Sequence, residues 1–341
     1  MTRIFTDGAE MGDTLFFSYA HPSYVTATAT SPASGSYCYA MYAAEGLGYK
    51  TITSASECYV RTRVKLESAT VFTQDPPYFP ALYSDNTAIL WLTMDGASHF
   101  RVATPDGALA TATSLFYADV WYMLEMYATI NDTSGSVIVK QNGIEIMNFS
   151  GDTKYSSYTS FNRVGWRGSH GALFNENNSI YIDDIALNDA NGSEDNSWCG
   201  GGHVELLIPA SDGDTLEWTP SSGSVHYEMV DEIPADGDTT YVSASAAKVD
   251  MYYLSPFSGS GKGPIGRVWV TARARDASYN GGNFRVGIKT SSGSILMSDW
   301  QTLGGLYDTN VQSSASPLNP DDDAAWEVAD INGLQVVIES E

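Results

Sequence analysis

The stretch Ser179-Ile180-Tyr181-Ile182-Asp183-Asp184-Ile185-Ala186-Leu187-Asn188-Asp189 decides how the rest of the chain is interpreted. Its β-branched, partly alternating residues predict a strand. A polar cluster over residues 188–196 and a triple glycine at 200–202 follow it. The segments on either side have the turn-rich pattern of antiparallel strands. We therefore expect two tandem units, residues 1–195 and 203–341, joined by a Gly-rich linker over residues 196–202.

The composition is typical of an all-β chain. Of its 341 residues, 43% are hydrophobic and only 17% are charged, and 21 are tyrosine. Aromatic and β-branched side chains pack well on pleated sheets, and Gly, Asn, Asp and Ser close turns. Long helical periodicity is missing almost everywhere. The predicted fold class is all-β, with two tandem antiparallel β-sandwiches of which the second is the smaller.

The chain is strongly acidic, with a net charge of −24 from 41 acidic and 17 basic residues. A surface of this sign repels nucleic-acid backbones and anionic lipids, so we expect neither as a partner. Three interpretations of the charge stay open: solubility, repulsion between many copies on one particle, and cation binding.

We expect neither a secretory signal nor a membrane span. Residues 1–7 lack an apolar run of the secretory type, and no stretch approaches the roughly 18 apolar residues of a membrane span. Cys38, Cys58 and Cys199 lack CxxC spacing, which argues against a zinc site or a disulfide framework. An extracellular type of composition without an export signal fits a protein made in a host cytoplasm and released by lysis, such as a virion component.

Residues 56–67 show the clearest alternation in the chain. One predicted face carries Cys58, Val60, Thr62, Val64 and Leu66, and the other carries Tyr59, Arg61, Arg63, Lys65 and Glu67. This pattern favours one buried and one solvated face. Asn142-Gly143 between two apolar segments predicts a hairpin with a type I′ turn. Pro76, Pro77 and Pro80 break the stretch after residue 67.

The second half has similar patterns. Strands are expected at 204–209, 265–275, 284–288, 295–297 and 334–338, with one helical turn within 324–331. Asp212-Gly213-Asp214 and Asp236-Gly237-Asp238 are interpreted as tight turns before strands, because neither has the spacing to a bidentate Glu that an EF-hand needs.

Several landmarks of the first half occur in a familiar order. They are Asp7-Gly8-Ala9-Glu10, the strand at 59–66, Trp121-Tyr122-x-Leu124-Glu125, the hairpin at 137–147, the segment 149–153, and Tyr181-Ile182-Asp183-Asp184-Ile185. In this order residues 1 to about 190 resemble laminin-G-like, concanavalin-type jelly rolls. The resemblance implies a jelly-roll β-sandwich for the first unit.

The second half adds further segments, at 214–220, 230–232, 236–243, 270–275 and 325–332. With these, the two-part layout resembles virion structural proteins of tailed bacteriophages. The resemblance implies a non-catalytic capsid decoration protein, head fibre or tail-associated component, displayed on the exterior of the virion. It also implies a homo-oligomer whose partners are other virion proteins, either major capsid or tail proteins.

Asp183 and Asp184 are the candidate metal ligands. Adjacent strand residues point to opposite faces, so the two carboxylates are not expected to form a catalytic pair by themselves. One of them could help to bind calcium at the rim of the jelly roll together with loop oxygens. The alternative is that they hydrogen-bond to the backbone of a neighbouring loop.

No enzyme is expected. Gly259-Ser260-Gly261-Lys262-Gly263 lacks the Ser or Thr that follows Lys in a phosphate-binding loop, and the five histidines form no HxxxH or HExxH pattern. The Glu-x-Asp-x-x-Glu arrangement of concanavalin-like retaining glycosidases is also missing.

A carbohydrate-binding adhesin that recognises host-surface glycan is the alternative function. Aromatic rings stack on sugar faces and neighbouring polar groups bind hydroxyls. Tyr78, Tyr83 and Trp166 are the main candidates for such a platform, and Phe79, Tyr155 and Tyr158, which are also expected in or near loops, are further ones. These aromatic residues could equally fill the core or pack against a partner subunit.

Overall fold

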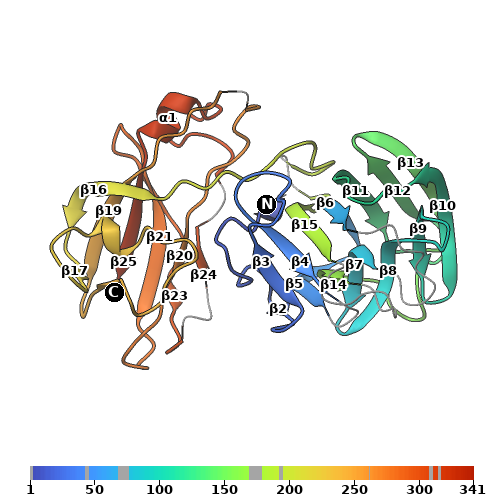
Figure 1. The fold of residues 1–341 in the computed structure, drawn as a ribbon, viewed down its shortest axis with the longest axis horizontal. Coiled ribbons are helices and arrows are strands. Elements are labelled where there is room, and N and C mark those ends of the chain that lie inside the picture. The colour runs from blue at the N-terminus through green and yellow to red at the C-terminus, as the bar shows by residue number, and fades with distance from the viewer. Residues whose placement is uncertain are drawn as a thin grey trace. The chain divides into compact units, whose positions relative to one another are not determined.

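The computed structural model describes residues 3–42, 46–67, 77–168, 179–191, 195–260, 262–306, 310–313 and 316–341. The chain divides into two compact units, Met1–Glu205 and Leu206–Glu341, each described below by itself (Figure 1). Strands dominate both units, so the all-β prediction is confirmed. None of the described helices is long and apolar enough to cross a membrane.

The first unit is a sandwich of two antiparallel sheets. Sheet A has the strand order β13-β12-β11-β6-β15-β4-β3, with β1 also pairing with β15. Its strands are β1 (Arg3–Asp7), β3 (Val25–Thr28), β4 (Cys38–Met41), β6 (Glu57–Leu66), β11 (Tyr122–Thr129), β12 (Gly135–Gln141), β13 (Ile144–Gly151) and β15 (Ile180–Asn188).

Sheet B has the order β10-β9-β8-β7-β14-β5-β2. Its strands are β2 (Tyr19–Ala20), β5 (Leu47–Ala55), β7 (Tyr78–Ser84), β8 (Thr87–Met94), β9 (His99–Thr104), β10 (Gly107–Leu115) and β14 (Phe161–Arg167). Alternate side chains of both sheets form one continuous apolar core. The face of sheet B that points away from this core is called the outer face of sheet B.

Strand β6 follows its predicted alternation on one side only. Its apolar face is fully buried in the core, as expected. The opposite face is not solvated throughout, because Arg61 and Lys65 are only 3% and 4% exposed. Arg61 Nη1 donates to the carbonyl of Gly200 at 3.0 Å, and Lys65 lies over the rings of Trp121 and Tyr181. A segment distant in sequence therefore covers part of the strand that the pattern assigned to solvent.

The predicted linker over residues 196–202 belongs to the first unit. Besides the Arg61 contact, the N–H of Gly200 donates to Glu125 Oε1 at 2.8 Å. The N–H of Val204 donates to Asp184 Oδ1 at 3.0 Å. The triple glycine is thus attached to sheet A, and the division of the chain lies between Glu205 and Leu206 rather than at residues 196–202.

Two local turn signals have different outcomes. Asn142 and Gly143 have φ angles of 51° and 83° and join β12 to β13, so the hairpin prediction is confirmed. Pro80, which we expected to break the chain, lies inside strand β7. It lies at the register shift between the Gly165–Ala81 and Arg167–Tyr78 pairs. The regular hydrogen bonds between the strands are interrupted there, so the missing N–H of proline removes none of them.

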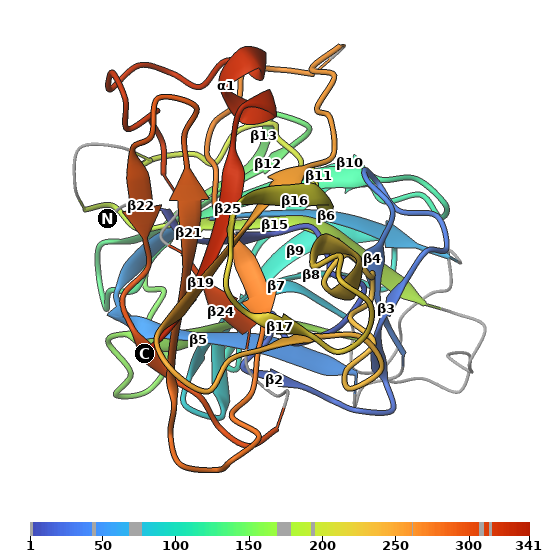
Figure 2. The same ribbon diagram turned by 90° about the vertical axis from the view of Figure 1, so that its left-hand side faces the viewer.

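The second unit contains a smaller sheet, sheet C, of order β16-β19-β25-β21-β22, with β23 also pairing with β21. Its strands are β16 (Pro209–Leu216), β19 (Lys248–Leu254), β21 (Asn283–Lys289), β22 (Ile295–Met297), β23 (Gln301–Thr302) and β25 (Gln335–Ser340). Figure 2 shows β22, β21 and β25 side by side. Two further pairs are β17 (Thr219–Pro220) with β18 (Val242–Ser243) and β20 (Thr271–Arg273) with β24 (Asn310–Gln312), and the helices are η1 (Tyr227–Met229) and α1 (Val328–Asn332).

Sequence patterns placed several strands of the second unit incorrectly. Residues 204–208 form no strand, and Asp212-Gly213-Asp214, expected as a turn, lies inside β16 at a register shift. The bulge explains the Gly, because a Cβ at Gly213 would lie 2.6 Å from the Met251 carbonyl oxygen. The alternation at 265–275 yields only isolated bridges and the short strand β20.

Candidate functional site

The Asp183-Asp184 pair is buried and anchors a loop. Asp183 Oδ2 accepts N–H bonds from Ala33 at 2.9 Å and Ser34 at 3.3 Å, while Ser34 Oγ donates to Asp184 Oδ2 at 2.9 Å. Arg63 Nε also lies 3.0 Å from Asp184 Oδ2. Simple alternation predicted that the two carboxylates face apart. A register shift after Asp183 and the positive φ of Asp184, 47°, instead bring both carboxylates to the same loop.

Further buried carboxyl groups lie around this loop. Burial raises the pKa of Asp183 to about 8, that of Glu10 to about 7 and that of Asp7 to about 6. Glu10 accepts the N–H of Ser36 at 2.8 Å, and the Tyr39 hydroxyl donates to Asp7. Among the described residues no three His, Cys, Asp or Glu side chains are arranged to hold a metal ion. Calcium binding by Asp183 and Asp184 stays a prediction, and it would need loop carbonyl oxygens as further ligands.

A second set of side chains lies on the outer face of sheet B. Cross-strand pairing aligns one row in the order Tyr19, Tyr49, Gly165, Ala81, Trp91 and Ala103. Successive strand residues alternate between faces, so this row points away from the core that Trp166, Leu82 and Leu92 help to form. Small residues in the middle of the row separate aromatic residues on either side.

The aromatic residues of this face form two stacked pairs. Tyr19 and Tyr49 have ring centroids 5.4 Å apart, and those of Tyr78 and Trp91 are 5.0 Å apart. All four rings are partly exposed. They come from β2, β5, β7 and β8, so long-range strand pairing, not sequence proximity, brings them to one face.

Gly165 allows tight packing at the centre of the face. A Cβ at this position would lie 3.0 Å from both Tyr49 Cβ and Tyr83 Cε2. The Tyr83 ring therefore packs across the glycine and is only 6% exposed. Burial raises the pKa of its hydroxyl above the usual value, so Tyr83 is protonated at neutral pH.

Three arginines accompany the aromatic residues. The guanidinium of Arg163 lies 4.5 Å from the Tyr49 ring centroid, and that of Arg167 lies 4.1 Å from the Tyr78 centroid. In register, Arg101 pairs with Thr93 on the same face. The outer face of sheet B therefore offers a ligand both cationic and aromatic groups.

The structure places two of the three aromatic residues predicted for the glycan platform on one face and the third in the core. Tyr78 and Tyr83 do lie on the outer face of sheet B, one partly exposed and the other buried beside it. Trp166 was wrong as a surface residue, because its side chain is 0% exposed and packs in the core, 6.2 Å from the ring of Phe17. Sequence reasoning missed Trp91 and the three arginines. Alternation through residues 161–167 would have placed Arg163 and Arg167 opposite Trp166.

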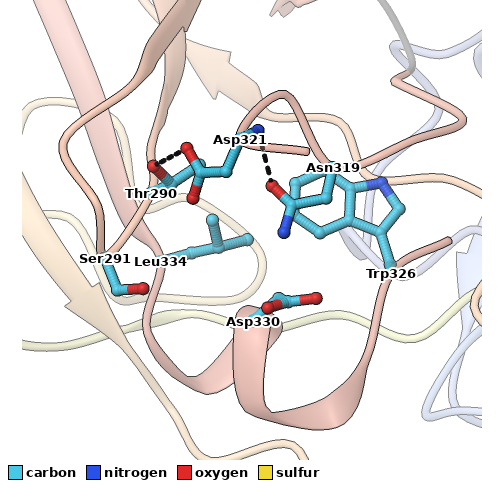
Figure 3. A pocket seen from close by; sticks show the side chains of 7 residues that line it. All are labelled: Thr290, Ser291, Asn319, Asp321, Trp326, Asp330 and Leu334. Carbon is cyan, nitrogen blue, oxygen red and sulfur yellow. Dashed lines mark hydrogen bonds between the residues drawn. The ribbon is translucent and has the colours of Figure 1, made fainter. Parts of the chain in front are cut away.

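The second unit has a small polar hollow, lined by Thr290, Ser291, Asn319, Asp321, Trp326, Asp330 and Leu334 (Figure 3). Thr290 Oγ1 donates to Asp321 Oδ1 at 2.8 Å, and the Asp321 N–H donates to Asn319 Oδ1 at 3.1 Å. Asp330 accepts the N–H of Glu327 at the start of α1. These polar groups hold the surrounding loops in place, which is a structural role.

A buried network lies beside β19 in the same unit. His226 Nδ1 and the Tyr252 hydroxyl lie 2.7 and 2.9 Å from Asp250 Oδ2. Asp250 Oδ1 accepts the N–H groups of Glu217 at 2.6 Å and Trp218 at 2.8 Å. Both carboxylate oxygens are engaged with the fold, so this network stabilises the turn after β16.

Comparisons with known proteins give distant structural similarity only. No protein-family model matches the chain, and no curated protein matches it. Among solved structures it is similar to the cellulose-induced protein Cip1, with a TM-score of 0.42 and 16% identity over 58% of this chain and 100% of that chain. An endo-β-1,4-glucuronan lyase from the fungus Trichoderma reesei has a TM-score of 0.42 and 11% identity, and the match covers 55% of this chain and 95% of that chain. The alginate lyase Aly36B has a TM-score of 0.40 and 12% identity, and the match covers 54% of this chain and 93% of that chain.

Proposed function

We propose that the outer face of sheet B binds a carbohydrate chain. The observation that carries the proposal is the presence of two partly exposed stacked pairs, Tyr19–Tyr49 and Tyr78–Trp91, on one face. Flat aromatic rings bind the apolar faces of sugars, and polar groups beside them bind hydroxyls. Ala81, Gly165 and Ala103, which have small side chains or none, lie between or beside the pairs in register.

The spacing of the pairs favours a chain over a single sugar. Tyr49 lies on β5 and Trp91 on β8, which are three strand positions apart in sheet B. Strands lie about 4.8 Å apart, so the two rings are separated by roughly 14 Å across the sheet. An oligosaccharide can contact both pairs at once.

The proposed activity is binding without cleavage. Burial raises the pKa of the Tyr83 hydroxyl, so at neutral pH it is protonated and cannot act as a general base. We expect the molar mass of a bound polysaccharide to stay constant on prolonged incubation, as size-exclusion chromatography would measure. Shortening of the polymer would replace the binding proposal with an enzymatic one.

Glycan binding is compatible with the proposed role on a virion. An exterior particle protein whose first unit binds glycan would attach the particle to a host surface. Copy-number counting by mass spectrometry of purified particles tests this location. Tens to hundreds of copies per particle favour a decoration protein and a few copies favour a tail adhesin. Absence from every particle would leave a free carbohydrate-binding protein.

The binding proposal is tested with a glycan array and the full-length chain. Tyr78→Ala and Trp91→Ala each remove one ring of a stacked pair and are expected to weaken binding about tenfold, because ring stacking contributes on the order of 1 kcal/mol or more. Tyr279→Ala removes a tyrosine of the second unit that is 70% exposed and serves as the control. Equal binding by all variants would contradict the assignment of the site to sheet B.

A further inference from the structure

The outer face of sheet B has the opposite charge character to the rest of the chain. Its seven strands, as the structure describes them, contain no Asp or Glu. The whole chain has 41 acidic residues in 341. Sheet A, by contrast, carries acidic residues in β1, β6, β11, β13 and β15. An acid-free sheet that presents three arginines is therefore a specific local feature of a polyanionic protein.

The three arginines have unused hydrogen-bonding capacity. The Nε atoms of Arg101, Arg163 and Arg167 are shielded from solvent and have no hydrogen-bond partner among the described residues. Such donors normally find a partner, and leaving one unsatisfied is costly. Arg163 Nη1 does donate, to the Asp85 carbonyl and to Asn86 Oδ1, both at 2.6 Å, but these acceptors are neutral. The positive charge is therefore not neutralised by these contacts.

Two acidic residues in the turns that join β7 to β8 and β8 to β9 are already engaged. Asp85 Oδ1 accepts the Asn162 side-chain amide at 2.7 Å. Asp95 lies 3.2 Å from His99 Nδ1 and accepts backbone N–H groups of its own turn. Neither carboxylate forms an ion pair with one of the three arginines. An external anion is the natural partner for them.

The arginines are too far apart for one small anion. Arg163 and Arg167 are four residues apart on β14, roughly 13 Å along the strand. Arg101 is on β9, three strand positions from β14, or roughly 14 Å across the sheet. A ligand that satisfies all three needs repeated anionic groups at intervals. The stacked Tyr78–Trp91 pair on β7 and β8 lies between β9 and β14 and calls for a sugar ring in the same ligand.

We infer that the carbohydrate bound by this face is a polyanionic glycan with repeated carboxylate or sulfate groups. The inference rests on the proposed carbohydrate site and adds the chemical class of its ligand. Guanidinium groups pair with carboxylates and sulfates through charge-assisted N–H bonds, and the strands around these arginines supply no carboxylate that would compete for them. The net charge of −24 repels a polyanion at long range, but physiological salt screens beyond about 8 Å, so the local arginines determine binding.

The test measures affinity of the full-length chain for four probes: polygalacturonate, dextran sulfate, neutral dextran and single-stranded DNA. We expect one or both anionic glycans to bind, which also distinguishes carboxylate from sulfate, and we expect dextran and DNA not to bind. Arg101→Gln and Arg167→Gln should each raise Kd about tenfold or more, since a charge-assisted hydrogen bond is lost. Arg285→Gln is the control, because Arg285 also stacks on an aromatic ring, Trp300 at 4.3 Å, but lies in the second unit.

Measurements on the unmodified chain keep the test independent of variant folding. Binding of the anionic glycan should weaken as NaCl is raised, and Arg167→Lys should bind more weakly than the wild type but better than Arg167→Gln. Binding of dextran with equal affinity and no effect of the arginine variants would overturn the inference and leave the carbohydrate site standing. Equal binding of DNA would overturn the assignment to glycan. Failure of every polysaccharide to bind would reject the proposed function itself.

Discussion

Gly165 determines how closely side chains pack on the outer face of sheet B. A Cβ at this position would be tightly packed, 3.0 Å from Tyr49 Cβ and Tyr83 Cε2, so these neighbours would have to shift by a few tenths of an ångström. The glycine therefore lets the Tyr83 ring pack closely against β14. A single methyl group at the centre of the proposed site should disturb both packing and binding.

Gly165→Ala is expected to lower the free energy of unfolding by about 1–3 kcal/mol, the usual cost of overpacking. It should also reduce glycan affinity by displacing Tyr83. Urea unfolding and binding assays would measure both effects. Gly201→Ala is the matched control, because its nearest neighbour would be Met123 Sδ at an ordinary 3.9 Å. Equal stability of the two variants would contradict the packing described for Gly165.

The buried carboxyl groups make stability depend on pH. The folded-state pKa values of Asp7, Glu10 and Asp183, about 6, 7 and 8, lie above the usual values of 3.8 for Asp and 4.5 for Glu. The native state therefore holds protons that the unfolded chain releases. The stabilisation from these groups is complete below about pH 4 and is lost as pH rises to about 8. Urea unfolding in EDTA between pH 5 and 9 should show a falling free energy of unfolding, and Asp183→Asn should flatten this dependence.

Calcium binding at Asp183 and Asp184 can be tested under the same conditions. A bound divalent cation would offset the cost of ionised carboxylates, so added CaCl₂ should raise the midpoint of urea unfolding more at pH 8.5 than at pH 5. MgCl₂ serves as the control cation. No shift with CaCl₂ at either pH would reject the calcium prediction and leave the pair with its loop-anchoring role.

At the level of elements, the sequence predicted what depends on local pattern. The buried face of β6, the Asn142-Gly143 turn and the strand character of β15 all follow from neighbouring residues. Strand β7 was not predicted, because Pro80 signals a break and only the register shift against β14 shows why it is tolerated. The Asp212-Gly213-Asp214 turn was predicted wrongly for the converse reason, since a bulge uses the same residues as a turn.

The candidate site was only partly predictable for the same reason. Tyr78 and Tyr83 could be selected as aromatic residues near loops, but their neighbours Trp91, Arg101 and Arg163 come from other strands. Those residues come together only through the order β9-β8-β7-β14 of sheet B. A single sequence does not show which strands pair, so the set of residues that share this face could not be predicted from it.

The β12–β13 hairpin allows its predicted turn type to be tested separately from side-chain packing. Gly143 has a φ of 83° and open space around it, so Gly143→Ala tests backbone strain without a packing effect. We expect a loss of about 1 kcal/mol in the free energy of unfolding, and a smaller loss for Gly143→Asn, because Asn tolerates positive φ. Chemical denaturation would measure both. Equal stability of wild type and Gly143→Ala would contradict the type I′ turn.

At the scale of the whole molecule, the division of the chain lies at Glu205 and not at residue 195. Residues 196–205 supply partners for Arg61, Glu125 and Asp184 on sheet A. Removing residues 196–205 would leave these charged groups without the hydrogen bonds that the segment makes to them, which lowers the stability of the first unit. The Gly-rich segment is therefore part of the first unit's structure.

Three fragments test this boundary. A fragment of residues 1–205 should melt several degrees above a fragment of residues 1–195, as measured by circular dichroism, since a loss of about 1–2 kcal/mol lowers Tm by roughly 2–8 °C in a unit of this size. A fragment of residues 1–202, which keeps the contacts of Gly200 but not that of Val204, should fall between them. Equal Tm values for all three would support the boundary at residue 195.

The central claim is that one face of sheet B binds a polyanionic glycan, and hydrogen–deuterium exchange of the full-length chain with and without polygalacturonate or dextran sulfate tests it most directly. Binding should slow amide exchange in peptides from β7, β9 and β14, where Tyr78, Arg101 and Arg167 lie. Peptides from β12 and β13 at the edge of sheet A should exchange at the same rate with and without the glycan. Protection confined to sheet A or to the second unit would contradict the account, because the glycan would then bind elsewhere on the chain.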